Sequence, residues 1–476
     1  MSISIFIFAA IILFTLGIAF YAGRQSNKQS VGDYLVGGRS FSVMILFFLA
    51  VGEIYGIGTI IGFPGGVYAG GFSYGIWFLA YIVLSYSFGY FISPLIWRAG
   101  HRYNALTAAD IFKSHFSSRK LELVVAVVLL MFLVPWAQLQ FEGLIVTLNA
   151  LGYDIPPYIA VIIAGAIAYI YISVSGVRSP ALISIFKDII LFAAIVVVGI
   201  AVYKKMGGVE PLFLGAKEKG AILKFQNGSE INFAISTIIL QSITFYCLPH
   251  LITVIFTSKS EKTIQKAQRY MPLYMLMFPF LIATSYYAMI YLPNLADKPN
   301  HTFIVSAIDL LPSWVIGFIA AGAALSGFLL LSVISLAVAG LIVRNIIPNV
   351  PEKSQRRYSQ TSVLIYLVIS MIITVALPSL MLNLISTAYG GFSQIVPGIF
   401  AVIFFKRATA KGIMAGIVVG IIAVFVMYFG KISIYAINPG IIAVMLNIVT
   451  LIIVSALTQK DVVDRTPIAY VEAENS

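Results

Sequence analysis

Charged residues are scarce in this chain of 476 residues. Only 10% of its residues are charged, whereas 60% are hydrophobic and the mean hydropathy is +0.99. Average soluble domains carry about 25% charged residues. The composition therefore excludes a soluble protein and indicates a polytopic membrane protein.

Cysteine and metal-binding patterns are also nearly absent. Cys247 is the only cysteine, which excludes an intrachain disulfide and argues against a metal–thiolate cluster. The sequence shows no metal-ligand cluster and no nucleophile–base arrangement, so we expect neither an enzyme nor a bound cofactor. We find no pore ring of a channel, and only about nineteen residues follow Leu457, too few for a signalling domain. A transporter is the class that remains favoured.

Apolar segments of roughly 18 to 28 residues follow one another along the chain, each long enough to cross about 30 Å of hydrocarbon. The first lacks a basic n-region and a cleavage pattern, so we interpret it as a retained helix. Thirteen spans are predicted, at about 4–21, 41–69, 72–97, 121–150, 158–177, 181–203, 231–256, 271–292, 313–343, 359–377, 383–405, 412–428 and 437–457. They form one transmembrane domain.

The basic residues predict the orientation of these spans. With the amino terminus outside, 23 of the 30 Lys and Arg residues fall on the cytoplasmic side, and Lys187 is counted among them. Five of the other 7 lie in the single loop 204–224. Basic residues gather in cytoplasmic loops, so we expect an outside amino terminus and a cytoplasmic carboxyl terminus in the cell membrane. Topology thus accounts for the net charge of +12, and no nucleic-acid partner is expected.

Two spans contain residues that disturb a helix. The second carries GEIYGIGTIIGFPGG (52–66) and the seventh carries QSITFYCLPH (241–250). An interrupted helix is tolerated in a membrane only where it is buried in protein or lines a cavity. Interruptions in corresponding halves indicate a midplane binding site of a secondary transporter. The halves would be 41–203 and 231–405, with the spans at 4–21, 412–428 and 437–457 at the periphery. For the glycines at 62, 65 and 66, close helix packing is an equal alternative.

Two carboxylates lie inside predicted spans. Glu53 belongs to the interrupted stretch, and an intramembrane carboxylate is costly and tends to mark an ion or proton path. Glu142 lies four residues after Gln138 on one face of the fourth span. We expect this polar face to turn toward the interior of the bundle.

Four motifs resemble the sodium:solute symporter family over about residues 33–420. They are DYLVGGRSFS (33–42), IGFPGGVYAGG (61–71), RYNALTAADIF (102–112) and GGFSQIVPGIF (390–400). The resemblance implies an all-α, LeuT-like fold with a five-plus-five inverted-repeat core, and symport driven by sodium.

Further stretches resemble the monocarboxylate-permease branch of the family, which takes up small organic acids. They are SGVRSPALISIFKD (175–188), VPWAQLQ (134–140), YCLPHLITVIFTSKS (246–260) and RNI (344–346). A monocarboxylate is therefore the expected solute. The alternatives are another small solute, such as a proline-like amino acid, or an uncoupled channel or sensor on the same fold.

The resemblance also implies where sodium would bind. In the family, sodium lies between two helices. Backbone carbonyls at the break of the second span bind it on one side, and the matching carbonyls here are those of Gly52 and Tyr55. A carbonyl and two neighbouring hydroxyls of the ninth span bind it on the other side. One register of the ninth span places Ser326 beside Gly327 at that pair, and the other places two leucines, 329 and 330, there. Neither supplies both hydroxyls, although a hard cation needs several oxygen ligands.

The missing hydroxyls leave two hypotheses for Glu53. Its carboxylate either supplies an oxygen to sodium or carries a proton itself, since a desolvated carboxyl group favours its neutral form. Glu142 is the alternative ion-coupling carboxylate. His250 is either a proton relay or a hydrogen-bonded residue at a helix end.

The solute is expected between the two interrupted stretches and the polar face of the fourth span. The predicted contacts are Tyr55, Gly56, Thr59, Trp136, Gln140, Gln241 and Tyr246. Trp136 and Tyr246 are equally well explained as packing aromatics. The glutamines are better candidates because their amides need partners in a dry bundle.

Overall fold

The computed structural model describes residues 3–25, 30–149, 151, 155–220, 228–379, 381–459 and 466–471. In this part of the chain the structure is helical, and its only β-bridge joins Phe41 to Ser258. Twelve of the described helices are long and apolar enough to span a membrane, and one bent helix pair makes a thirteenth candidate. The predicted number of spans is confirmed.

The spans in chain order are α1 (Ile3–Gln25); α3 (Val43–Ile54) with the π-helical turn η2 (Gly58–Gly62) and the start of α4 (Phe63–Arg102); the rest of α4; α6 (Arg119–Asn149); α7 (Pro157–Ser175); α8 (Arg178–Met206); α10 (Gly228–Thr244) with η3 (Phe245–Cys247) and α11 (Pro249–Thr257); α12 (Glu261–Tyr270) with η4 (Met271–Met277) and α13 (Phe278–Tyr291); α15 (Ser313–Gly340) with η7 (Leu341–Ile346); α16 (Glu352–Ala376); α17 (Met381–Phe392) with η8 (Ser393–Ile395) and α18 (Val396–Phe404); α19 (Ala410–Phe429); and α20 (Pro439–Leu457). Short helices α2 (Val31–Val36), α5 (Ala108–Phe116), α9 (Val209–Glu218) and α14 (Thr302–Leu310) lie between them.

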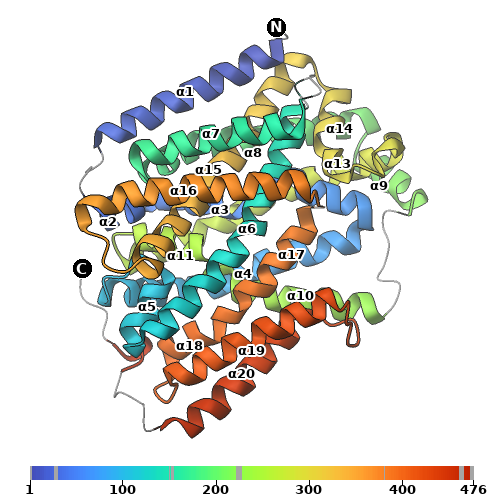
Figure 1. Ribbon diagram of the computed structural model, residues 1–476. Helices are drawn as coiled ribbons and strands as arrows, with labels where there is room; N and C mark the ends of the chain where they lie inside the picture. The colour runs from blue at the N-terminus through green and yellow to red at the C-terminus, as the bar shows by residue number, and fades with distance from the viewer. Residues whose placement is uncertain are drawn as a thin grey trace.

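The ninth span lies at the centre of the bundle. In its apolar stretch, 94% of the residues are buried inside the protein, against 33% in the first and the last spans. Figure 1 shows α1 at one edge and the pair α19 and α20 at the opposite edge. The exact bounds of the two repeats stay a prediction.

Both expected interruptions are present. α3 ends at Ile54, Tyr55 leaves the helical conformation (φ −105°, ψ 64°), and η2 starts at Gly58. In the seventh span Leu248 is extended (φ −62°, ψ 132°), as a residue before proline tends to be. Pro249 then starts α11 at an angle of 44° to the preceding segment.

Of the glycines that follow the first break, Gly65 shows a contact that requires glycine for packing. A Cβ on Gly65 would lie 2.6 Å from the Pro299 carbonyl oxygen, and one on Gly62 would lie 3.3 Å from the Met381 Cβ. Contacts this close to backbone require glycine, so the packing interpretation holds for Gly65. Gly71 (φ 71°) separates the second span from the third within α4.

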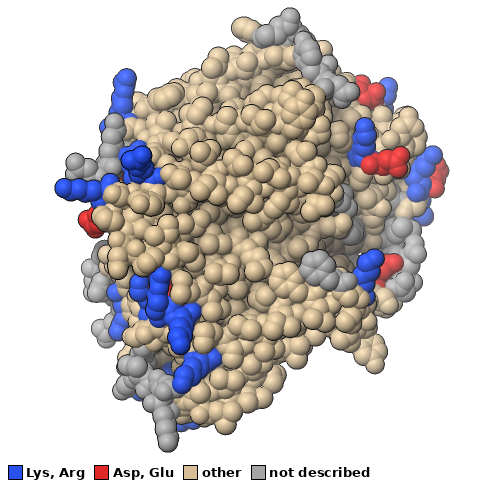
Figure 2. Space-filling view, viewed as in Figure 1, with Lys and Arg blue, Asp and Glu red and all other residues tan. Residues whose placement is uncertain are grey.

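Charged side chains gather at two opposite ends of the molecule. Figure 2 shows Lys and Arg at the end on the left, mixed charges at the end on the right, and an uncharged band between them. The band fits the hydrocarbon layer around a multi-pass membrane protein. Lys28, Lys224, Lys460 and Arg465, which entered the topological count, lie outside the described residues.

One residue in that count was placed wrongly. Lys187 is fully buried in α8, about two turns after the helix starts. A buried ammonium inside a span reports nothing about cytoplasmic loops, so Lys187 does not support the orientation.

Candidate functional site

A small cavity lies where the two breaks meet. Its volume is about 30 Å³, and since a water needs about 10–15 Å³ of such space, this conformation admits water but not an organic solute. The lining residues are Glu53, Ile54, Gly56, Gly58, Thr59, Phe78, Tyr81, Trp136, Leu139, Phe245, Leu248, Leu251, Leu330, Ile385 and Tyr389.

Four of the predicted solute contacts surround the break of the second span. Gly56, Thr59 and Trp136 line the cavity. Gln140 faces the same break, because its Oε1 would lie 3.9 Å from a Cβ on Gly56. Its Nε2 donates to the Trp136 carbonyl at 3.1 Å, whereas Oε1 has no partner among the described residues. That oxygen is free to accept a hydrogen bond from a ligand.

The Tyr55 side chain turns away from the cavity toward the eighth span. Its hydroxyl is hydrogen-bonded to the Tyr86 hydroxyl, and its ring stacks on Tyr274 with the centroids 5.4 Å apart. Only the backbone of Tyr55 remains at the break. A side-chain contact from Tyr55 to solute would need this packing to change.

Tyr246 and Gln241 do not line the cavity either. The Tyr246 hydroxyl donates to Gln268 Oε1 of α12 at 2.7 Å. Gln241 is fully buried, and its amide meets no partner in the described part of the chain. Their contacts with solute stay predictions.

Two half-helices begin at the cavity. The second half of the second span starts just after Gly56, and α11 starts at Pro249. The N-terminal end of a helix carries a partial positive charge and exposes backbone N–H groups. These ends favour an anionic group, which at this cavity is either the Glu53 carboxylate of the wall or a carboxylate of a ligand.

His250 lies beside the cavity wall. It is fully buried, and its ring stacks on Trp136 with the centroids 5.6 Å apart and an interplanar angle of 27°. Neither ring nitrogen has a hydrogen-bond partner among the described residues. The hydrogen bond expected of an ordinary helix-end histidine is therefore not made here, and the relay hypothesis stays open.

Glu142 contacts backbone at the end of the tenth span. Its Oε1 accepts a hydrogen bond from the Ser379 N–H at 3.0 Å. Gln138, one turn earlier, donates to the Leu377 carbonyl at 2.5 Å. The polar face of α6 thus turns inward as predicted. These two side chains form hydrogen bonds with the backbone of the segment that follows α16, and Glu142 is not among the residues that line the cavity.

The sixth span brings a charged pair to the first break. Lys187 and Asp188 are fully buried, and Lys187 Nζ forms an ion pair with Asp188 Oδ1. A Cβ on Gly52 would lie 3.0 Å from Lys187 Nζ. The same two charges act on Glu53, whose Oε2 has no hydrogen-bond partner among the described residues.

This lysine and aspartate end the motif at 175–188, but the resemblance carried by that motif assigned them no role. Two adjacent charged residues inside an apolar span were the available signal. Such residues are costly in lipid and usually functional, so the pair could have been predicted as part of the site.

Whether the break can bind sodium depends on the oxygen ligands that the surrounding residues offer. Of the residues in the two registers of the ninth span, Leu330 is the one that lines the cavity. Ser326 Oγ donates to the Gly322 carbonyl of its own helix at 2.9 Å. The ninth span therefore presents an aliphatic side chain where two hydroxyls would be needed.

The charge at Gly52 also disfavours sodium. Like charges about 4 Å apart repel by about 4 kcal/mol at an effective dielectric constant of about 20. Lys187 Nζ lies beside Gly52, so its positive charge would repel a sodium ion bound to the Gly52 carbonyl. The residues present do not fit sodium at this break.

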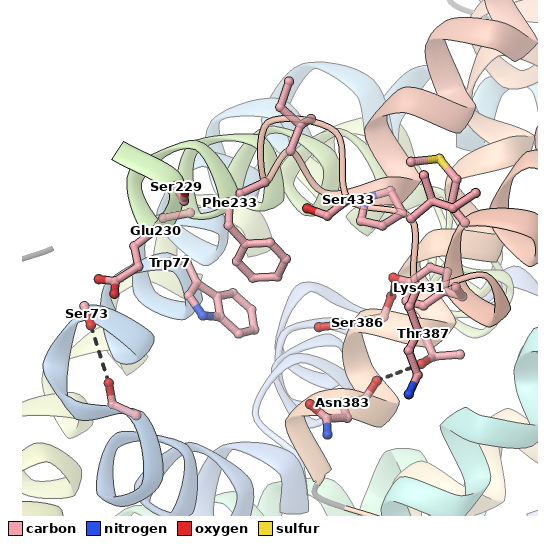
Figure 3. Close-up of a pocket in the computed structure, with 18 residues that line it drawn as sticks. Ser73, Trp77, Ser229, Glu230, Phe233, Asn383, Ser386, Thr387, Lys431 and Ser433 are labelled. Carbon is pink, nitrogen blue, oxygen red and sulfur yellow. Dashed lines mark hydrogen bonds between the residues drawn. The ribbon is translucent and has the colours of Figure 1, made fainter. Parts of the chain in front are cut away.

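A larger pocket of about 890 Å³ opens toward the end of the molecule that carries the α19–α20 link. Figure 3 shows Trp77 pointing into it, with Glu230 and Lys431 on opposite walls. From Trp77 a series of ring contacts leads to the cavity through Tyr81, Tyr389 and Trp136, with centroids 6.2, 5.8 and 5.7 Å apart. These four rings, the aromatic path, connect the wall of the pocket to the wall of the cavity.

The opposite end is closed by contacts around the start of the second span. The backbone of Phe41 pairs with residues 257 and 259 at the end of α11. Trp97 Nε1 donates to the Ser258 carbonyl at 2.8 Å, and Arg98 forms two hydrogen bonds of 2.7 and 2.8 Å with Glu261. We call these contacts the inner closure, because the predicted orientation would place them on the cytoplasmic side. The protein is therefore open at one end and shut at the other.

The family model described as the sodium:solute symporter family matches residues 34–420 of this chain. The chain belongs to the sodium:solute symporter family. The family is one of secondary transporters and not of enzymes, and membership implies a solute and sodium as partners. The motif-based prediction is confirmed.

Individual relatives differ in what their names say they carry. The symporter is 28% identical over 438 residues to a "Monocarboxylate transport permease protein" of Rhizobium johnstonii, covering 88% of this chain and 87% of that one. It is 24% identical over 496 residues to a "Sodium/proline symporter" of Staphylococcus aureus, covering 98% and 94%.

The fold agrees with solved transporters. A Na+-coupled sialic acid symporter, solved in a substrate-bound outward-open state, superposes with a TM-score of 0.80 at 14% identity, covering 98% of this chain and 99% of that one. At this identity the likeness establishes the fold, which is LeuT-like.

Proposed function

We propose that this symporter couples the inward movement of a cation to uptake of a small monocarboxylate. The observation that carries the proposal is the meeting of two half-helix N-termini at one buried cavity. Their partial positive charges complement one carboxylate without requiring a basic side chain in the wall. The similarity to a monocarboxylate permease supports the same class of solute.

Alternating access is the mechanism that we propose. The 890 Å³ pocket gives access from one end, the inner closure blocks the other, and the cavity between them is too small for a solute. Solute binding must then displace the aromatic path, and release must open the inner closure. Rocking of the two halves about the breaks supplies both movements. With the amino terminus outside, the large pocket faces the exterior.

Uptake by purified protein in liposomes tests the solute. We expect saturable accumulation of radiolabelled pyruvate, competed by other short monocarboxylates, and little accumulation of proline. Proline accumulation without pyruvate transport would replace the monocarboxylate by an amino acid. Solute-evoked current without accumulation would indicate a channel instead.

The driving ion is tested in the same vesicles. An inward sodium gradient and an inward proton gradient are imposed separately, and accumulation under each is compared with that in equilibrated vesicles. Accumulation under either gradient supports symport, and accumulation under neither would overturn it.

A further inference from the structure

We propose that the Lys187 ammonium is a built-in cation that takes the place of sodium at the break of the second span. Transport by this symporter would then need no sodium at that site. The transport consequence rests on the proposed function, whereas the occupancy of the site can be measured without any solute.

The geometry places one positive charge beside Gly52, whose carbonyl belongs to the predicted sodium site, and Lys187 Nζ makes no hydrogen bond to that carbonyl. Lys187 Nζ lies so near the backbone of Gly52 that an added Cβ would be 3.0 Å from it. The Cβ of Ser184, one turn earlier on α8, would lie 3.9 Å from the same added Cβ on Gly52. The sixth span therefore crosses the broken helix at Gly52, and glycine leaves the room that the ammonium uses.

The surrounding charges match an ammonium. Asp188 forms an ion pair with Lys187, and Glu53, one residue after Gly52, interacts electrostatically with both. Asp188 also acts electrostatically on Tyr274, which stacks on Tyr55. One buried carboxylate, that of Asp188, is thus paired with the buried cation, and Glu53 lies within the field of both without forming an ion pair in the described part of the chain. Buried charges in a membrane interior are costly unless they are paired.

The ligands that sodium would need are missing on the opposite side. Sodium held by oxygen atoms requires several of them in one shell, but α15 presents Leu330 to the break and turns the Ser326 hydroxyl to its own backbone. A fixed ammonium needs fewer partners, because one side is occupied by its own aliphatic chain. The missing hydroxyls and the presence of Lys187 are therefore explained together, since an ammonium that replaces sodium does not need those hydroxyls.

A purely structural ion pair is the competing explanation. A structural Lys187–Asp188 pair would stabilise α8 and would have no effect on ion selectivity. The two explanations differ in what happens when the lysine is removed. A built-in cation predicts that uptake by the variant without Lys187 comes to depend on a free cation drawn to the remaining carboxylates, whereas a structural pair predicts only a loss of stability.

Sodium binding to the purified protein is the first measurement. We expect thermal unfolding of the wild-type protein to be the same in sodium chloride and in choline chloride, and no saturable binding of radioactive sodium. A ligand that binds only the folded state would raise the unfolding temperature. Saturable sodium binding or a sodium-specific rise in the wild type would overturn the proposal.

The variant Lys187→Ala is the second measurement. We expect its unfolding temperature to become dependent on sodium, and its uptake in sodium-free medium to fall at least about tenfold, within the usual range of coupling between sites. Lys187→Ala combined with Asp188→Asn serves if the single variant does not fold, since it removes both members of the pair. The control is Lys204→Ala, an exposed lysine at the far end of the same helix.

Two results would contradict the role of Lys187. One is normal accumulation by Lys187→Ala without sodium, which would show that the built-in charge is not needed. The other is wild-type uptake that requires sodium. Failure of pyruvate as the solute would leave the sodium-binding results unaffected, so the two proposals fail separately.

Discussion

Leu330 fills the space beside Gly56. A Cβ on Gly56 would lie 2.7 Å from Leu330 Cδ2, and the ninth span thereby packs directly on the break of the second. The break is thus held by an aliphatic contact to the most buried helix of the bundle.

Gly56→Ala is expected to impair uptake strongly. The added methyl group overpacks the break, which typically costs about 1–3 kcal/mol, and it displaces either Leu330 or the backbone that faces the cavity. Adding Leu330→Ala should restore part of the uptake, because it removes the clashing Cδ2. Initial rates of pyruvate uptake in liposomes measure both effects.

Gly17→Ala is the matched control, since no atom lies within 4 Å of a Cβ at that glycine of α1. Its uptake should equal that of the wild type. If Gly56→Ala were as active as Gly17→Ala, the contact at Leu330 would not shape the site.

Glu53→Gln should keep the fold but abolish accumulation. The carboxylate is buried in the cavity wall and lies within the electrostatic field of Lys187 and Asp188, and either hypothesis for it requires a negative charge. Exchange of solute across equilibrated vesicles can survive, because the change preserves side-chain shape. Concentrative uptake and exchange are measured on the same preparation.

Glu142→Gln should remain concentrative. Its amide oxygen can still accept the hydrogen bond that Glu142 receives from the Ser379 N–H. A larger defect in Glu142→Gln than in Glu53→Gln would identify Glu142 as the ion-coupling carboxylate.

The inner closure should open during transport. Spin labels at Lys259→Cys, at the end of α11, and Ser114→Cys, on α5, occupy exposed positions of that side. We expect the distance distribution between them to shift when solute and the coupling cation are added together. An unchanged distribution at saturation would contradict opening at this place.

Thiol labelling in intact cells tests the orientation. Asn383→Cys in the wall of the large pocket should react with an impermeant reagent added outside, whereas Lys259→Cys should react only after permeabilisation. The natural Cys247 is buried and should stay unlabelled in both cases. The opposite pattern would invert the membrane topology.

Hydropathy and local backbone chemistry were readable from the sequence. Thirteen spans follow from segment length alone, because lipid forces each apolar segment to satisfy its own backbone. The break at Pro249 follows from the extended preference of a residue before proline, and the glycines from 52 to 66 identified the other break. The family could be predicted because four of its motifs occur in this chain in the expected order.

Only the tertiary structure decided which side chains meet at the breaks. Lys187 reaches Gly52 through the crossing of two helices that are more than a hundred residues apart in sequence, and no local pattern encodes that crossing. Tyr55 and Glu142 turned to other partners for the same reason: a span's sequence shows which residues are polar, but packing against neighbouring helices decides what each of them faces.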